Sequence, residues 1–155
     1  MKFLLDSHLL VWLLTGDERV GREAQSLIDD PTSESIASVI SIWEVAIKWP
    51  LRRGSPSDMP FSGRDFAEAL TKAGIEILAS TPVHAIGLDA LPLLHGDPFD
   101  RLLLATARSQ GMTLLTRDAA LAGYGAGVRL IRQAHEPHLQ VRRFRNHSSL
   151  STPNS

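Results

Sequence analysis

The sequence predicts an α/β protein built on a mostly parallel sheet that is flanked by helices. Two observations lead to this prediction. Short runs of four or five residues rich in apolar side chains alternate along the chain with longer segments of helical periodicity. The chain has 155 residues, of which 43% are hydrophobic, so one domain with a substantial core is expected. Strands that alternate with helices are joined by crossover connections and therefore pair in parallel.

The first half of the chain contains two predicted strands and three predicted helices. The strands span residues 2–5 and 34–37, and the helices span residues 8–14, 20–28 and 39–49. Ser7 and Ser38 precede two of these helices and are candidate N-caps, because a serine hydroxyl accepts a hydrogen bond from a free amide of the first turn. Pro50 is expected to end the third helix, and the bulky Trp43 and Ile47 within it are expected to pack in the core.

The second half continues the alternation after a loop over residues 52–60, which contains two prolines and one glycine. Gly74 closes a helix around Phe66, and the dipeptide Thr81-Pro82 opens another by the cap-then-proline signature. Further helices are predicted over residues 98–109 and 119–121, and strands over residues 75–78, 112–116 and 128–131. The predicted sheet therefore has four to five strands, since the segment 34–37 is the weakest candidate.

The apolar periodicity stops at Gln133, so we predict one domain over residues 1–132 and a tail over residues 133–155. The tail is basic through Arg142, Arg143 and Arg145 and then rich in serine, a composition that favours disorder. A flexible basic arm can add salt-sensitive affinity for a polyanion, but a tail without function explains the arginines equally well.

Charge and composition bound the possible functions. Sixteen Lys and Arg against 17 Asp and Glu leave a net charge of -1, which gives no overall electrostatic argument for a nucleic-acid partner. The chain has no cysteine, which excludes disulfides and thiolate zinc sites. Asp6 interrupts the apolar start of the chain and no run approaches membrane-spanning length, so a cytoplasmic protein is expected.

Two aspartates three residues apart open the predicted helix over residues 98–109. Asp97 is a good N-cap and Pro98 suits the first helical position, while Asp100 falls in the first turn, where the helix dipole favours a negative charge. Helix-start chemistry therefore explains both acids, and a metal ion held by one or both of them is the alternative.

Other acids are expected close to this pair. Asp6 ends the first predicted strand, and Asp118 lies two residues past the strand over residues 112–116. In an open parallel sheet, the strand ends and the starts of the following helices lie at the same edge, where ligands bind. Acids from three distant parts of the chain are therefore predicted to meet. Glu44, in the middle of an otherwise apolar helix, either faces solvent or turns toward a charge.

Carboxylates gathered at one edge repel one another, by roughly 1 kcal/mol for a pair about 4 Å apart in water and by several times more near a protein surface. Either some of them hold a proton, or a cation compensates their charge. Because the chain has no cysteine and its six histidines lack metal-ligand spacing, Mg²⁺ or Mn²⁺ fits best. Such an ion activates water and neutralises charge on a phosphoryl oxygen.

Four blocks of the sequence, taken in order, resemble the PIN-domain family and, more narrowly, the VapC-type toxins of type II toxin–antitoxin systems. The blocks are Phe3-Leu4-Leu5-Asp6-Ser7-His8, Trp43-Glu44-Val45-Ala46-Ile47-Lys48, Asp97-Pro98-Phe99-Asp100-Arg101-Leu102-Leu103 and Leu114-Leu115-Thr116-Arg117-Asp118. The resemblance extends over residues 1–131. It implies a three-layer α/β/α sandwich with a mostly parallel sheet of four to five strands, and an endoribonuclease that depends on Mg²⁺ or Mn²⁺.

The resemblance also implies roles for individual residues and a set of partners. Asp6 and Asp100 match the main metal ligands of the family, Glu44 matches its helix-borne acid, and Asp118 matches the acid after its fourth strand. The implied partners are an RNA substrate and a cognate antitoxin protein, in a homodimer or a toxin–antitoxin hetero-oligomer.

Two more residues match positions near the family's site. Asp97 matches an extra acid of this subgroup, which we assign mainly to helix capping and to a supporting position behind the ligands. Thr116 matches a small hydroxyl residue beside the site. The departures from the family pattern are Pro50, just after the Trp-Glu helix, and the tail from Gln133.

Two other function classes are kept as alternatives. The first is a PIN-type module that binds RNA or protein without catalysis, against which the complete set of acids argues. The second is an aspartyl-phosphate enzyme, because Asp6 ends a strand. A phosphatase of that type needs a second aspartate two positions on, where this chain has His8.

The remaining candidates receive a structural interpretation. His95 lies near the predicted site, where a loop or capping histidine is expected rather than a catalytic base. All three tryptophans are expected in the core rather than as platforms for RNA bases. Lys48, Arg52 and Arg53 form a basic cluster beside Glu44, for which solvated loop charge is slightly favoured over contacts with RNA phosphates.

Overall fold

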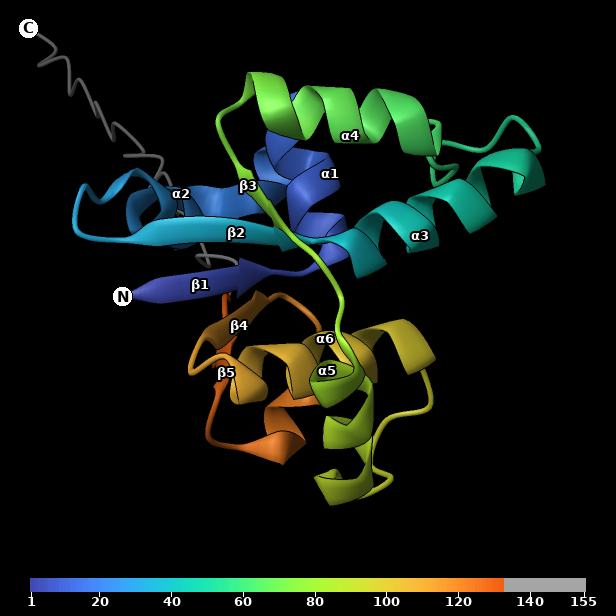
Figure 1. Ribbon diagram of the computed structural model, residues 1–155. Helices are drawn as coiled ribbons and strands as arrows, with labels where there is room; N and C mark the ends of the chain where they lie inside the picture. Colours follow the sequence, from blue (N-terminus) through green and yellow to red (C-terminus); the bar gives the residue numbers. More distant parts are fainter. Residues whose placement is uncertain (133–155) are drawn as a thin grey trace, which may run out of the picture.

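The computed structural model describes residues 1–132 and has the predicted α/β/α sandwich architecture (Figure 1). Five strands pair in parallel in the order β3-β2-β1-β4-β5. They are β1 (Lys2–Leu5), β2 (Glu34–Ser38), β3 (Glu76–Leu78), β4 (Thr113–Thr116) and β5 (Val128–Leu130). All five predicted strands are therefore confirmed. The predicted tail over residues 133–155, with its three arginines, lies outside the described residues.

Helices cover both faces of the sheet. On one face lie α1 (Ser7–Thr15), α2 (Gly21–Asp29) and α4 (Gly63–Lys72), and on the other lie α5 (Pro82–Ile86) and α6 (Pro98–Ser109) (Figure 1). The remaining helix, α3 (Val39–Lys48), extends beyond the end of β2 and contacts both α4 and α6. Short 3₁₀ turns span Glu18–Val20, Trp49–Leu51, Gly87–Ala90 and Ala119–Tyr124. Among the described helices, none combines the length and apolar composition needed to cross a membrane.

The central strand β1 contributes residues to two separate apolar clusters. Phe3 and Leu5 are buried with Phe66 of α4 in one cluster, while Leu4 is buried with Leu103 of α6 in the other. Successive side chains of a strand point to opposite faces of the sheet, so three adjacent apolar residues supply both layers. This burial on both sides explains why β1 reads as a continuous apolar run.

The helix α1 begins differently from its prediction. The N-cap is Asp6, whose Oδ1 accepts a hydrogen bond from the backbone N–H of Leu9 at 2.8 Å. Ser7 is instead the first helical residue, and its hydroxyl donates to the Ser41 hydroxyl of α3 at 2.9 Å. The prediction of Ser7 as N-cap is wrong because the strand ends directly in the helix, so the last acid of the strand takes the capping position. Ser38 caps α3 as predicted.

The prediction that Trp43 and Ile47 pack in the core is wrong. Their side chains are 56% and 43% exposed, and Trp12 and Trp49 are only half-buried. Since α3 extends past the sheet, residues 1–132 cover only one of its faces. The buried residues of α3 are Ile40, Ser41, Glu44 and Val45. Helical periodicity identifies two faces, but it does not tell which of two apolar faces meets the sheet.

Candidate active site

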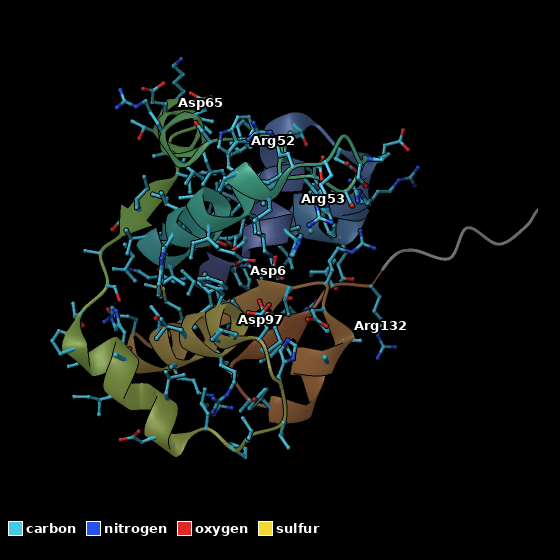
Figure 2. All side chains as sticks on the ribbon, turned by 90° about the vertical axis from the view of Figure 1, so that its right-hand side faces the viewer. Asp6, Arg52, Arg53, Asp65, Asp97 and Arg132 are labelled. Atoms are coloured by element: carbon cyan, nitrogen blue, oxygen red, sulfur yellow. The ribbon has the colours of Figure 1, made fainter. Side chains whose placement is uncertain are left out.

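The ends of β1 and β4 and the start of α6 bring four aspartates to one edge of the sheet. Asp6 follows β1, Asp118 follows β4 by two residues, and Asp97 and Asp100 open α6. The end of β1 and the start of α6 lie close together, because the charges of Asp6 and Asp97 both raise the pKa of Asp100. Figure 2 shows Asp6 and Asp97 on the same face of the molecule.

Asp6 is the most deeply placed of these acids, with 5% of its surface exposed. While Oδ1 caps α1, Oδ2 accepts a hydrogen bond from the Thr116 hydroxyl at the end of β4. Burial raises the pKa of Asp6, and the negative charge of Glu44 acts in the same direction, against the lowering effect of the two hydrogen bonds and of His8. The carboxyl group is therefore held rigidly in a place that disfavours its own charge.

Thr116 links the two central strands at this edge. Besides donating to Asp6, its hydroxyl oxygen accepts the backbone N–H of Asp118 at 3.0 Å. Asp118 in turn caps the following 3₁₀ turn through Oδ1, which accepts from the backbone N–H of Ala120 at 2.9 Å. Its other oxygen, Oδ2, is directed toward α6 and comes within 3.2 Å of His95 Nε2.

The two aspartates of α6 have different surroundings. Asp97 is the N-cap, and its Oδ1 accepts hydrogen bonds from the backbone N–H groups of Phe99 at 2.8 Å and Asp100 at 3.3 Å. Burial, supported by the charges of Asp97, Asp6 and Glu44, raises the pKa of Asp100 to about 6, although a hydrogen bond from His95 counteracts the shift. The capping role predicted for Asp97 is confirmed. Asp100 is the residue whose negative charge is disfavoured by its surroundings.

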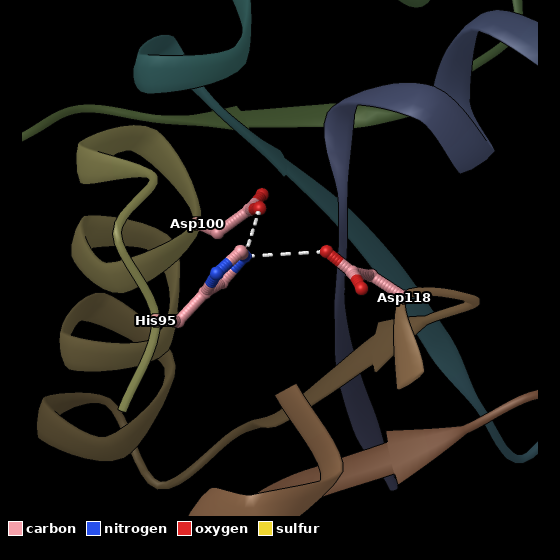
Figure 3. A group of neighbouring side chains, drawn as sticks. All are labelled: His95, Asp100 and Asp118. Atoms are coloured by element: carbon pink, nitrogen blue, oxygen red, sulfur yellow. Dashed lines mark hydrogen bonds and ion pairs between the residues drawn. The ribbon is translucent and has the colours of Figure 1, made fainter. Parts of the chain in front are cut away.

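His95 is the site residue that sequence reasoning missed. Its Nε2 lies 2.8 Å from Asp100 Oδ2 and 3.2 Å from Asp118 Oδ2, so the imidazole joins the two acids (Figure 3). Burial alone would lower the pKa of His95, but the hydrogen bond and charge of Asp100 and the charges of Asp118 and Asp97 raise it. The available signal was its position two residues before the helix cap, in the loop that enters the site.

Glu44 turns toward a charge rather than toward solvent, which resolves the alternative that periodicity left open. Its side chain is 2% exposed, and Lys48, one turn later on α3, lies 2.5 Å from Oε2. Oε1 is buried and has no hydrogen-bond partner among the described residues. A buried carboxylate oxygen without a donor is costly, so Glu44 is poised to accept a further positive or hydrogen-bonding group.

The donor set fits a hard divalent cation. Carboxylate oxygens dominate it, the pKa values of Asp6 and Asp100 are raised by burial, and Glu44 Oε1 lacks a partner in the described part of the chain. Mg²⁺ and Mn²⁺ are bound by such oxygens, and either ion would offset the repulsion among them.

The stabilising effect of Asp100→Asn on the metal-free protein is expected to grow between pH 4 and pH 7. The pKa of Asp100 is about 6 in the folded chain against 3.8 for a free aspartate, so above pH 4 the unfolded chain loses this proton first, and folding becomes less favourable as pH rises. The full shift would correspond to about 3 kcal/mol, which partial solvent access reduces to about 1 kcal/mol at pH 7.

Urea unfolding in EDTA, followed at both pH values, measures this difference. Asp65→Asn on α4, which changes an exposed acid outside the site, is the matched control and should show no such growth. A stabilising effect of Asp100→Asn that is equal at pH 4 and pH 7 would contradict the expected burial of the Asp100 charge.

A pocket of about 570 Å³ lies along α1, and the acids of the site are not among the residues that line it. His8, Trp12 and Lys48 line it together with residues 56–60, and Lys48 connects it to the site through its ion pair with Glu44. Of the predicted basic cluster, Lys48 is thus paired with the buried Glu44 and lies on a helix rather than in the loop. Arg52 stacks on Trp49 and donates to its carbonyl oxygen, and Figure 2 shows Arg52 and Arg53 above Asp6.

The chain is similar to a protein-family model and to a known ribonuclease. The family model described as the PIN domain matches residues 3–126. The chain is also 32% identical, over 123 residues, to the ribonuclease VapC22 of Mycobacterium tuberculosis, an alignment that covers 78% of this chain and 90% of that protein.

Several solved structures share the fold. A VapBC2 complex from Rickettsia felis, bound to a DNA fragment from its promoter, matches with a TM-score of 0.59 at 14% identity and covers 84% of this chain and 98% of the other. A toxin–antitoxin complex from Klebsiella pneumoniae matches with a TM-score of 0.57 at 21% identity, with the same coverage of both chains. FitAcB from Neisseria gonorrhoeae matches with a TM-score of 0.56 at 22% identity and covers 86% and 99%.

Proposed function

The chain belongs to the PIN domain family, and from this premise we propose that it is a metal-dependent endoribonuclease that acts as the toxin of a toxin–antitoxin pair. The observation that carries the proposal is the meeting of Asp6, Asp100 and Asp118 with the buried Glu44 at one edge of the sheet. The relative at 32% identity is a ribonuclease, which supports RNA as the substrate.

In this proposal, Asp6, Glu44, Asp100 and Asp118 hold the divalent ion, with Mg²⁺ and Mn²⁺ as the candidates. When bound, such an ion lowers the pKa of a coordinated water and neutralises charge on the phosphodiester. Without a cation, this acidic edge would repel the RNA backbone. The acids themselves therefore explain both the need for an ion and the place at which the scissile phosphate would lie.

The surrounding residues position these acids. The Thr116 hydroxyl keeps Asp6 Oδ2 in one orientation, and the capping bond from Leu9 does the same for Oδ1. Lys48 holds Glu44 through Oε2 and leaves Oε1 available. Because both oxygens of Asp6 accept protein hydrogen bonds, this aspartate suits an orienting and ligating role better than that of the nucleophile in an aspartyl-phosphate enzyme.

The partner that we propose is a cognate antitoxin protein. Solved structures that share the fold are VapBC and related toxin–antitoxin complexes, which supports this class of partner. An antitoxin that inhibits the enzyme would either cover the acidic edge or keep RNA from the pocket along α1. The product of the neighbouring reading frame is the candidate to examine.

The purified full chain is expected to cut RNA at discrete positions when Mg²⁺ or Mn²⁺ is supplied. Mapping of new RNA ends after incubation with total cellular RNA, with and without the product of the neighbouring reading frame, measures both parts of the proposal. We expect the candidate antitoxin to copurify with the chain and to suppress cleavage. Binding of RNA without new ends, in either ion, would favour the non-catalytic module instead.

A further inference from the structure

We propose that His95 supplies a nitrogen ligand, through Nε2, to the divalent ion held by Asp100 and Asp118, and that the site consequently favours Mn²⁺ over Mg²⁺. The inference rests on the proposed metal-dependent function. It adds a fifth residue, and a different donor atom, to the four acids that the sequence pattern indicates.

The position of the imidazole is the first argument. His95 lies in the loop that precedes α6, and its side chain is 17% exposed. Figure 3 shows the ring between Asp100 and Asp118, with Nε2 directed at both. The backbone N–H of His95 donates to the hydroxyl of the buried Tyr124 at 3.1 Å, so the loop that carries the ring is anchored to the turn after Asp118.

The spacing of the three donor atoms is the second argument. Ligands at roughly 2.1 Å from an octahedral ion lie about 3.0 Å apart along an edge of the octahedron. His95 Nε2 is 2.8 Å from Asp100 Oδ2 and 3.2 Å from Asp118 Oδ2. One donor atom from each of the three residues lies within 4.8 Å of the others. Two of the three spacings therefore match edges of an octahedral coordination sphere, and the third pair of donor atoms lies within 4.8 Å.

The caps that orient the acids around the imidazole are the third argument. Asp118 Oδ1 caps the 3₁₀ turn after β4, and Asp97 Oδ1 caps α6. Because Oδ1 of Asp118 caps the turn, its Oδ2 is directed at the imidazole nitrogen, which also lies beside Asp100 Oδ2. An ion bound by the two aspartate oxygens would meet Nε2 without a change in the path of the loop, and the proton that Nε2 shares with Asp100 would be released to solvent as the nitrogen binds the ion.

The chemical consequence concerns which ion binds. Mg²⁺ and Ca²⁺ select oxygen ligands, whereas Mn²⁺ and the later divalent ions accept imidazole nitrogen more readily. One nitrogen among carboxylates should therefore increase the preference for Mn²⁺. If His95 were only a clamp between the two acids, the ion would displace the ring and this preference would not depend on it.

The test is electron spin echo spectroscopy of Mn²⁺ bound to the full-length protein, after EDTA treatment and dialysis. Modulation from a directly bound ¹⁴N nucleus is expected, and growth with ¹⁵N-labelled histidine should replace it by the ¹⁵N pattern. His95→Ala should abolish the modulation, while His8→Ala, which changes an exposed histidine beside Asp6, should retain it. Because the labelling experiment uses the wild-type chain, it stands even if a variant folds poorly.

Titration of both ions against wild type and His95→Gln gives the second readout. We expect the ratio of Mn²⁺ to Mg²⁺ affinity to fall by about tenfold in the variant. Absence of nitrogen modulation in the wild type, or an unchanged affinity ratio, would overturn the assignment of His95. Failure of the proposed function looks different, because RNA would then remain uncut in either ion whether or not nitrogen is bound.

Discussion

Asp6→Asn is expected to lower the rate of RNA cleavage by about a hundredfold to a thousandfold, on the scale seen when a group that stabilises transition-state charge is removed, while the fold is retained. Asparagine has the size of aspartate, and its amide oxygen can still accept the backbone N–H of Leu9 that caps α1. It removes the negative charge that the ion needs. Because burial raises the pKa of Asp6, loss of this charge should not reduce stability at pH 7.

The measurement is single-turnover cleavage of a mapped RNA site by wild type and variant, with circular dichroism and thermal unfolding as checks on the fold. Asp65→Asn is the matched control, since it makes the same chemical change at an exposed position on α4, away from the acids (Figure 2). It should cleave at close to the wild-type rate. An Asp6→Asn protein that folds normally and cleaves like the control would exclude Asp6 from the metal site.

Removal of divalent ions is expected to abolish cleavage without unfolding the chain. The two apolar clusters that hold the layers together do not include the acids, so the metal-free protein should remain folded. Returning Mn²⁺ at about 100 times its dissociation constant should stabilise the fold by about 2.7 kcal/mol, or roughly 5–10 °C in Tm for a chain of this size.

The pH dependence of this effect has a definite sign. The ion binds the carboxylate form of Asp100, whose pKa is about 6, so protons compete with the ion below that value. Mn²⁺ affinity should therefore rise as pH increases toward 6 and above. The shift in Tm between EDTA and either Mn²⁺ or Mg²⁺, measured by calorimetry at pH 5 and pH 7.5, tests this pH dependence. Asp100→Asn should show little Mn²⁺ shift, and cleavage that persists in excess EDTA would contradict a metal-dependent mechanism.

Much of the fold could be predicted because its signals are local. The caps at Ser38 and Asp97 lie within three residues of the amides that they bind. The strand β1 is recognisable from its own four residues and the acid that ends it. Local hydrogen bonds and side-chain periodicity operate over a few residues, so the sequence carries this information directly.

Features that depend on contacts between distant segments could not be predicted as well from the sequence. Trp43 was expected in the core because α3 has apolar residues on two faces, and the outcome depended on how far α3 extends past the sheet. Glu44 was ambiguous because its burial follows from the same docking. Asp6 took the capping position from Ser7 because the strand joins the helix without a linker, and Ser7 found its partner 34 residues away on α3.

The sequence by itself therefore determined the order of strands and helices, the parallel sheet and the acids that such a sheet brings to one edge. Only the tertiary structure decided that Glu44 faces the site with one oxygen that has no partner within residues 1–132, and that the imidazole of His95 lies between Asp100 and Asp118. The physical reason is that a side chain's orientation depends on the packing of layers that are remote in sequence. Asp100 and Asp118 are 18 positions apart and belong to different elements, and the sheet edge brings both within hydrogen-bonding distance of one ring.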